Sequence, residues 1–212
     1  MGNEFNGWPS MKIAILVEGA TEKAFKPILT DFLKSRLQQR MPRLQFIPYD
    51  GRIPKEEKLK RIVKNLLTGK QAVNAVIALT DVYTGTNDFQ NAADAKDKMT
   101  AWVGNCPNFY PHAAQYDFEA WLLPYWKTIQ DLAQHNKSSP GGLPEQVNHN
   151  NPPSYRIKEI FEIGKCKRSY NKIRDAASIL KKNDLIFAVN QCSELKAFLN
   201  TILSLCEVDL IP

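Results

Sequence analysis

Acidic side chains directly follow two strongly apolar segments of this sequence, and this placement could support metal chemistry. The apolar run 12–17 ends at Glu18, and Glu22 lies in the first turn of the helical pattern that follows. A second apolar run, 75–80, ends at Asp81. Folds that alternate strands and helices place their chemistry outside the carboxyl ends of the strands. Two neighbouring strands that deliver carboxylates to one edge would form a divalent-cation site for phosphate chemistry.

Three further acids lie in comparable positions. Asp88 is in the loop after Asp81, while Asp117 and Glu119 follow an expected strand near 109–115. Two bare carboxylates about 4 Å apart repel by roughly 4 kcal/mol at an effective dielectric near 20. Such crowding is tolerated when a cation lies between the acids or when one of them keeps its proton. Hard oxygen ligands of this kind suit Mg²⁺ or Mn²⁺.

Each of the flanking acids also has a purely structural alternative. Glu22 could serve only to interact with the positive end of its helix dipole. Asp88 could cap the helix that follows its loop, and Asp117 or Glu119 could cap the helix that begins at Phe118. Glu18 and Asp81 have weaker structural alternatives, because each ends an apolar run at the expected sheet edge.

Two other residues of these turns are candidates. Gly19 is expected to supply a tight turn between strand and helix. Tyr83 could contact phosphate or a metal-bound water, or could anchor its loop. The sequence contains no G-x-x-x-x-G-K-[ST] phosphate loop and no G-x-S-x-G elbow. These absences argue against ATP hydrolysis by a phosphate loop and against an α/β-hydrolase mechanism.

The elements that must position these acids alternate along the chain. Strands are expected at 12–17, 44–48, 75–80 and 109–115, with helices at 21–39, from Pro54 onward, and at 92–103. This alternation predicts an α/β fold with a mostly parallel, Rossmann-like sheet flanked by helices. The expected organisation is a leader or extension at 1–10, an α/β core at 11–134, a loop at 135–154 and a C-terminal helical region at 155–212, which packs on the core.

The composition of the chain argues against a membrane protein and makes nucleic acid a plausible partner. The chain has 212 residues, 43% of them hydrophobic, without an apolar stretch long enough to span a bilayer and without a signal peptide in residues 1–10. Its four cysteines form no C-x-x-C pair, which is typical of free thiols in the reducing cytoplasm. A net charge of +6 makes nucleic acid a plausible partner. The alternative is that its lysines and arginines lie on solvated helix faces.

Four ordered motifs carry a resemblance to known families. The segment 17–22, Val-Glu-Gly-Ala-Thr-Glu, resembles the V-E-G-x-T-E signature of TOPRIM-like domains, the metal-binding fold of topoisomerases, primases and overcoming-lysogenization-defect nucleases. Segments 81–89, 115–120 and 153–158, together with Tyr170-Asn171-Lys172, resemble the motifs of the bacterial domain of unknown function 4276 family. The resemblance extends from Met11 to the last helix.

The resemblance implies a TOPRIM-like nuclease in which Glu18 and Asp81 are the leading metal ligands. Tyr83 stands where TOPRIM domains usually have a second aspartate, so Asp88 or Glu119 is expected to supply the further ligand. The resemblance also implies a role beside a partner ATPase in bacterial anti-phage defence.

The leading hypothesis is therefore a cytoplasmic Mg²⁺- or Mn²⁺-dependent nuclease that cleaves DNA or RNA. Glu22 would bind the metal through water or orient the attacking water, and Arg156, Lys158 and Lys172 would contact the nucleic-acid backbone. A second hypothesis is a non-catalytic module that docks on an ATPase and senses nucleic acid or a phage protein. A third is phosphoryl or nucleotidyl transfer on a small nucleotide by the same site. The sequence predicts no oligomeric state.

Overall fold

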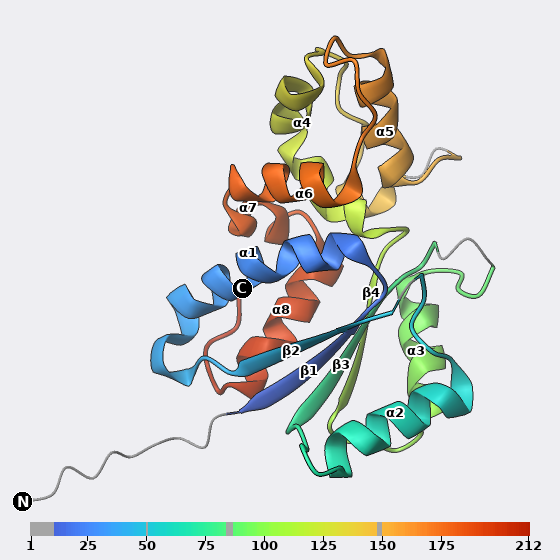
Figure 1. The fold of residues 1–212 in the computed structure, drawn as a ribbon, viewed down its shortest axis with the longest axis vertical. Helices are drawn as coiled ribbons and strands as arrows, with labels where there is room; N and C mark the ends of the chain where they lie inside the picture. The colour runs from blue at the N-terminus through green and yellow to red at the C-terminus, as the bar shows by residue number, and fades with distance from the viewer. Residues whose placement is uncertain (1–10, 50, 84–86, 148–149) are drawn as a thin grey trace, which may run out of the picture.

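The core of the protein is a four-stranded parallel sheet. The computed structural model describes residues 11–49, 51–83, 87–147 and 150–212. The strands lie in the order β2-β1-β3-β4 (Figure 1). Their bounds are β1 Lys12–Val17, β2 Arg43–Pro48, β3 Ala75–Asp81 and β4 Phe109–Ala114, and each neighbouring pair is parallel. The predicted α/β fold is confirmed.

The strand order reverses direction between β1 and β3. From β1 the chain passes through α1 (Ala20–Leu37) to β2 on one side, whereas β3 and β4 extend the sheet on the other side. A crevice outside the carboxyl ends of two such strands is the usual ligand-binding position of open α/β sheets. Glu18 directly follows β1, and Asp81 is the last residue of β3, so both acids lie at this position.

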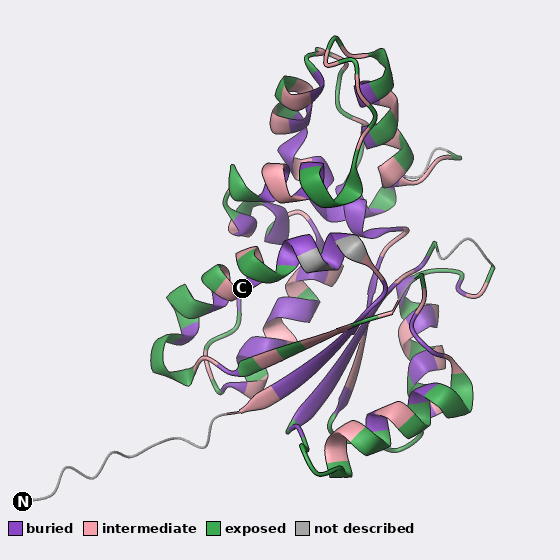
Figure 2. Cartoon of the chain, viewed as in Figure 1, coloured by how far each residue is buried: buried purple, intermediate pink, exposed green. Residues whose placement is uncertain are grey.

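Helices cover both faces of the sheet because the strand side chains alternate in direction. In β1, Ile13, Ile15 and Val17 belong to one apolar cluster with α1 and the C-terminal helix α8 (Ser193–Leu205). Ala14 and Leu16 pack on the other side, in a second cluster. Figure 2 shows the central strands buried between these layers.

Two of the described helices form a second layer, on the face of the sheet opposite α1 and α8. The second layer holds α2 (Glu56–Thr68) and α3 (Ala92–Val103). After β4 the chain forms η2 (Phe118–Tyr125), α4 (Trp126–Ala133), η3 (Pro144–Gln146), α5 (Pro153–Ile163), α6 (Lys172–Lys181) and α7 (Leu185–Val189). A short η1 (Gln38–Arg40) ends α1.

The helical lobe formed by α4, α5 and α6 stands over the carboxyl ends of the strands (Figure 1). Its apolar residues belong to the same cluster as α1 and one face of the sheet, so the lobe and the sheet share one core. The sequence predicted a loop through 154, but α5 begins at Pro153, because proline suits the first position of a helix. The segment before it is anchored: Lys137 accepts hydrogen bonds from Trp126 Nε1 and Gln130 Nε2 through its carbonyl oxygen.

Two helix predictions differ from the structure. The second helix begins at Glu56 rather than at Pro54, because Lys55 takes the N-cap position. The helix at Phe118 is a 3₁₀ helix that contains Pro124, whose ring blocks a regular α-helical turn. The four cysteines are free thiols, as predicted. Among the described helices, none combines the length and apolar character that crossing a bilayer requires.

His112, a buried residue of β4, provides a pH-dependent test of this core. Burial, together with the charge of Lys96, lowers the pKa of His112 to about 4, and its Nδ1 has no hydrogen-bond partner among the described residues. Between pH 6.5 and 4 the unfolded chain therefore binds more protons than the folded chain at this site. The free energy of unfolding should therefore decrease as the pH falls through that window, by up to about 3 kcal/mol. Urea unfolding of wild type and His112→Phe at pH 7 and pH 4.5 should show the smaller pH-dependent loss in the variant; equal losses would contradict the prediction.

Candidate metal centre

Glu18 and Asp81 lie beside each other at the carboxyl edge of the sheet. Val17 is paired with Leu79, so the next residue, Glu18, lies alongside Thr80. Accordingly, the Thr80 hydroxyl donates a hydrogen bond to the Glu18 carboxylate. The backbone N–H groups of Asp81 and Ile53 donate to the same carboxylate. These donors hold a nearly buried carboxylate in place at the switch point of the sheet.

Glu18 is buried in a way that opposes its ionisation. Only 6% of the residue is exposed. Burial raises the pKa of Glu18 to about 7, and the negative charge of Glu22 acts in the same direction. The hydrogen bonds from Thr80 and the backbone offset only part of this effect. At neutral pH a nearby cation would therefore stabilise the charged form substantially.

Asp81 experiences the combined field of the other four acids. Its pKa is raised well above the usual value, first by burial and then by the charges of Glu22, Glu18, Asp117 and Glu119. Glu18 directly follows β1 and Glu22 lies in α1, whereas Asp117 and Glu119 lie at the start of η2, far away in sequence. The fold therefore brings five of the six predicted acids into one electrostatic group, hereafter the acid cluster: Glu18, Glu22, Asp81, Asp117 and Glu119.

Glu22 combines a structural role with its place in the acid cluster. Its Oε2 accepts a hydrogen bond at 3.1 Å from the N–H of Gly19, the N-cap residue of α1. Glu22 therefore also has a structural role at the start of this helix. Burial nevertheless raises its pKa. Gly19 itself has an extended backbone with φ −157°, and the predicted turn therefore needs no left-handed glycine.

Asp117 and Glu119 contribute the other side of the cluster. Asp117 Oδ2 accepts a hydrogen bond from Ser154 N–H at 3.1 Å, whereas Oδ1 is buried without a hydrogen-bond partner among the described residues. Glu119 is fully buried, and burial together with the charge of Asp117 raises its pKa to about 7. Although Asp117 is the N-cap residue of η2, its side chain makes no capping hydrogen bond there.

A lysine from the helical lobe lies against the acid cluster. Lys172 Nζ is 3.4 Å from Glu119 Oε2, and Tyr170 Oη donates to Glu119 Oε1 at 3.4 Å. Burial works against the charged form of Lys172, but the charges of Glu119, Asp117 and Asp81 outweigh it, so its pKa is raised. Sequence reasoning placed Lys172 among the phosphate-contacting residues but gave Tyr170 no role. The Y-x-K element was the signal that could have identified both.

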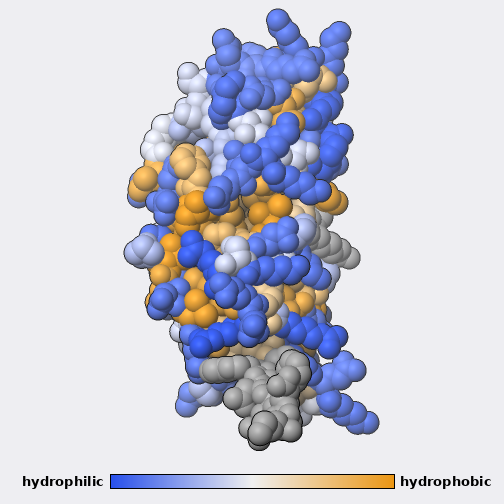
Figure 3. Space-filling model, turned by 90° about the vertical axis from the view of Figure 1, so that its left-hand side faces the viewer, coloured by the Kyte–Doolittle hydropathy of each residue, from blue (hydrophilic) through white to orange (hydrophobic). Residues whose placement is uncertain are grey.

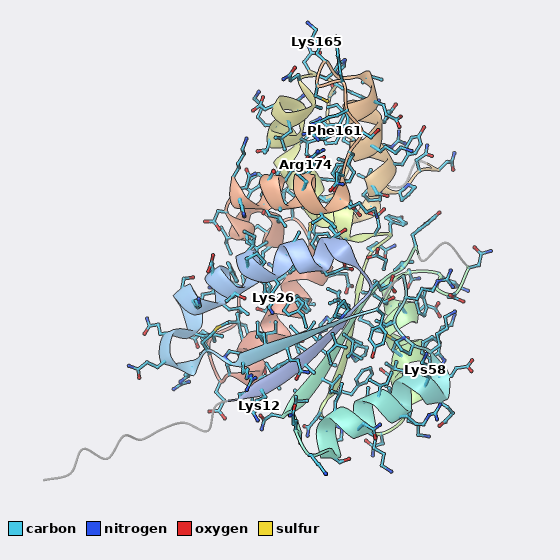
Figure 4. All side chains as sticks on the ribbon, viewed as in Figure 1. Lys12, Lys26, Lys58, Phe161, Lys165 and Arg174 are labelled. Atoms are coloured by element: carbon cyan, nitrogen blue, oxygen red, sulfur yellow. The ribbon has the colours of Figure 1, made fainter. Side chains whose placement is uncertain are left out.

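The chain turn that carries Tyr170 and Lys172 is fixed by a buried aspartate. Asp175 is fully buried; its carboxylate accepts two hydrogen bonds from Arg168 Nη1, at 2.8 and 2.9 Å, and one from Asn171 N–H at 2.7 Å. Arg174 also pairs with it at 3.0 Å. Arg168 and Arg174 therefore stabilise the fold. Figure 4 shows Arg174 on α6 and Lys165 at the far end of the lobe, away from the sheet.

The remaining candidates lie in different surroundings. Asp88 pairs with Lys55 and, at 3.3 Å, with Arg52, so its role as a metal ligand gains no support from these contacts and stays a prediction. Arg156 lies 3.9 Å from Glu159, and Lys158 lies 3.6 Å from Glu162. Their roles in nucleic-acid binding also stay predictions.

The carboxylates of the acid cluster suit a hard cation, although their present arrangement does not form a complete metal site. Within the described residues, no three His, Cys, Asp or Glu side chains form a group that could hold a metal ion as they stand. Two observations nevertheless fit a cation: the shared field that raises the pKa of Asp81, and the unpartnered Asp117 Oδ1. Carboxylates so crowded are stabilised when a cation lies between them.

Comparisons with known proteins agree with this fold. The chain is similar to the "C-terminal region of the Burkholderia pseudomallei OLD protein", with 13% sequence identity, a TM-score of 0.52, and coverage of 92% of this chain and 98% of that one. The corresponding region of the Xanthomonas campestris pv. campestris OLD protein gives 13% identity, a TM-score of 0.48, and coverage of 93% and 96%. No curated protein matches the sequence.

A family model also matches the sequence itself. The match runs from residue 17, the last residue of β1, to residue 203, and thus includes the whole acid cluster, the helical lobe and most of α8. The chain belongs to the family described as domain of unknown function, DUF4276.

Proposed function

We propose that this chain is a TOPRIM-like, Mg²⁺- or Mn²⁺-dependent nuclease that hydrolyses phosphodiester bonds of nucleic acid. The observation that carries the proposal is the convergence of five carboxylates at the switch point of a parallel sheet, with one lysine held against them. The fold similarity to an OLD C-terminal region agrees with the sequence resemblance to TOPRIM-like domains. Such a site suits a reaction on phosphate, because a phosphodiester needs a cation to approach carboxylates.

The residues of the acid cluster would have different roles in such a reaction. Glu18, Asp81, Asp117 and Glu119 would hold the cation, while Glu22, already fixed by Gly19 N–H, would orient the attacking water. A divalent ion bound there supplies polarisation of the phosphoryl oxygen and a lower pKa for the attacking water. Lys172 would neutralise part of the charge that the phosphate brings to the cluster.

The net charge of the chain suits a polyanionic substrate. Figure 3 shows hydrophilic side chains over the upper end of the face it displays, at the height of the helical lobe. The net charge of +6 coexists with a strongly acidic centre, so positive charge predominates elsewhere on the protein. Long-range attraction would bring nucleic acid to the protein, and Lys172 would guide a phosphate toward the acid cluster. Arg156 and Lys158 remain candidate backbone contacts on α5.

Incubation of the purified chain with plasmid, single-stranded DNA and tRNA tests the proposal. Mn²⁺ is expected to support cleavage of at least one substrate, and excess EDTA is expected to stop it. Glu18→Gln keeps the size of the side chain but removes its charge, and should lower the rate at least about 10³-fold, a cost of about 4 kcal/mol in the barrier. Cleavage at the wild-type rate by this variant would refute the site assignment.

A second candidate function is a non-catalytic module that docks on an ATPase. Two observations favour it: the described residues contain no metal-ready group, and Tyr83 stands in place of an expected aspartate. Calorimetric titration with Mn²⁺ separates the two candidates, since a folded chain that binds neither Mn²⁺ nor Mg²⁺ would support the docking module. A partner ATPase and a role in anti-phage defence are part of both proposals and rest on the sequence resemblance.

A further inference from the structure

Two tyrosines flank the acid cluster at the edge of the sheet. Tyr83 lies two residues after Asp81, and Tyr116 directly precedes Asp117. Their ring centroids are 6.0 Å apart with an interplanar angle of 59°, and Tyr83 N–H donates a hydrogen bond to the Tyr116 carbonyl oxygen at 2.5 Å. Tyr83 is 48% exposed. The pair therefore presents aromatic surface to solvent next to the candidate metal centre.

The backbone of Tyr116 is held in an unfavourable conformation. Its φ is +71°, in the left-handed region that a bulky residue seldom adopts. Such strain persists only where the surrounding structure imposes it, and it concentrates at functional sites. Here the hydrogen bond from Tyr83 holds the strained peptide, which places the Tyr116 ring beside Tyr83 rather than in the core.

Tyr116 also lines a pocket of about 800 Å³, a volume within the usual range of ligand sites. The residues that line the pocket include Gln115, Gln146 and Asn190, whose side chains end in amides. Gln115 Oε1 accepts a hydrogen bond from Ala92 N–H at 2.8 Å, which fixes the orientation of the amide and leaves its NH₂ group as a donor. Amides offer both donors and acceptors, the complement of a nucleobase edge.

The two acids that line this pocket already have partners within the protein. Glu145 accepts hydrogen bonds from Trp121 Nε1 at 3.0 Å, from Ser193 Oγ at 2.9 Å and from Glu194 N–H at 3.1 Å. Glu194 pairs with Lys96 Nζ at 2.8 Å. Both carboxylates are therefore already engaged, which leaves the side chains of Gln115, Gln146 and Asn190 as candidate partners for a nucleotide base.

We propose that Tyr83 and Tyr116 form a stacking platform for an unpaired base, whose edge is bound by the amide pocket. Where the proposed nuclease activity holds, its substrate is therefore single-stranded nucleic acid. A base in a duplex has both faces stacked and its pairing edge occupied, so it reaches neither the rings nor the amides. An unpaired base offers both, and stacking on an aromatic side chain tolerates any base.

Binding measured without metal tests this inference apart from catalysis. The probes are fluorescein-labelled dT12, U12, a 12-residue abasic strand with the same phosphates, and a 12-base-pair duplex, all in EDTA and low salt. Wild type should bind dT12 or U12 about 10-fold more tightly than the abasic strand. The dT12 and U12 arms distinguish DNA from RNA, and base dependence in either one supports the inference.

Variants then assign that base dependence to the tyrosines. Tyr83→Ala removes an exposed ring, and Tyr116→Asn removes the other ring with a residue that tolerates positive φ. Each should weaken binding of the base-bearing strand about 10-fold and leave abasic binding unchanged, whereas Tyr83→Phe and Tyr116→Phe should bind as wild type does. Melting curves check that each variant is folded. Equal losses for base-bearing and abasic strands, or tighter binding of the duplex, would overturn the inference.

The same measurements separate this inference from the proposed function. Base-dependent binding without cleavage in Mn²⁺ would refute only the nuclease. Metal-dependent cleavage accompanied by binding that ignores the bases would refute only the stacking platform.

Discussion

Asp81→Asn is expected to abolish metal-dependent cleavage and, at the same time, to raise the melting temperature of the metal-free protein. Asp81 is crowded by four carboxylates, and its pKa is raised first by burial and then by their charges. Asparagine has nearly the same shape without the charge. At pH 8 the gain should be about 2 kcal/mol, or about 4–8 °C for a chain of this size. Differential scanning fluorimetry in EDTA measures it.

The sign of the pH dependence follows from the raised pKa of Asp81. The folded protein keeps the Asp81 proton to a higher pH than the unfolded chain does, so wild-type stability falls as the pH rises through that window. Asparagine does not titrate there. The advantage of Asp81→Asn should therefore be small at pH 5 and largest at pH 8. Mn²⁺ should raise the melting temperature of wild type at pH 8 and leave that of the variant nearly unchanged.

Asp175→Asn is the matched control, since it makes the same change at an aspartate that is fully buried and paired with arginines. Burial opposes ionisation of Asp175, but hydrogen bonds from Arg174 and Arg168 outweigh it, so the pKa of Asp175 is lowered. Removing this charge leaves two arginines without their partner and should destabilise the protein by about 3 kcal/mol. A loss of stability in both variants would contradict the view that Asp81 is held against repulsion.

Such opposite effects are typical of a functional site within a stable scaffold. Acids that a fold forces together reduce its stability, and they are tolerated where function requires them. Asp175 is paired by arginines that stabilise the turn before α6, whereas Asp81 faces other acids. The contrast separates a structural carboxylate from a candidate ligand without reference to activity.

Local patterns were sufficient to predict the sheet and two of its acids. The runs before Glu18 and Asp81 are continuously apolar because β1 and β3 are covered on both faces, and such runs end where the sheet ends. The position of both carboxylates at one edge follows from parallel pairing. The 3₁₀ form of η2 was not predicted, because helical spacing alone does not distinguish it from an α-helix.

Contacts between distant segments could not be predicted from local sequence patterns. Asp88 pairs with Lys55, 33 residues away, so its position near the predicted site did not reveal its partner. The approach of Lys172 to Glu119 spans 53 residues and depends on how α6 packs against α1 and η2. Likewise, the strained Tyr116 backbone has no signature in residue type, since tyrosine rarely takes a positive φ.

Lys172→Met is expected to lower the cleavage rate about 10²–10³-fold, while the variant still binds Mn²⁺. The ammonium group lies 3.4 Å from Glu119, where a phosphate approaching the acid cluster would bring further negative charge. Removing one fixed donor that meets developing charge typically costs a rate factor of this size. Methionine keeps the apolar stem, so packing is retained. Single-turnover cleavage with saturating enzyme separates this loss from weaker binding.

Lys158→Met is the control for loss of positive charge alone, because Lys158 is exposed on α5 and pairs with Glu162. It should reduce affinity modestly and leave the single-turnover rate within about 3-fold of wild type. Lys172→Arg should restore part of the lost rate, since it returns the charge with a different geometry. Mn²⁺ should stabilise Lys172→Met at least as strongly as wild type, because the competing cation has gone. A wild-type rate in Lys172→Met would instead make Lys172 only a counter-ion that keeps Glu119 charged in the metal-free protein.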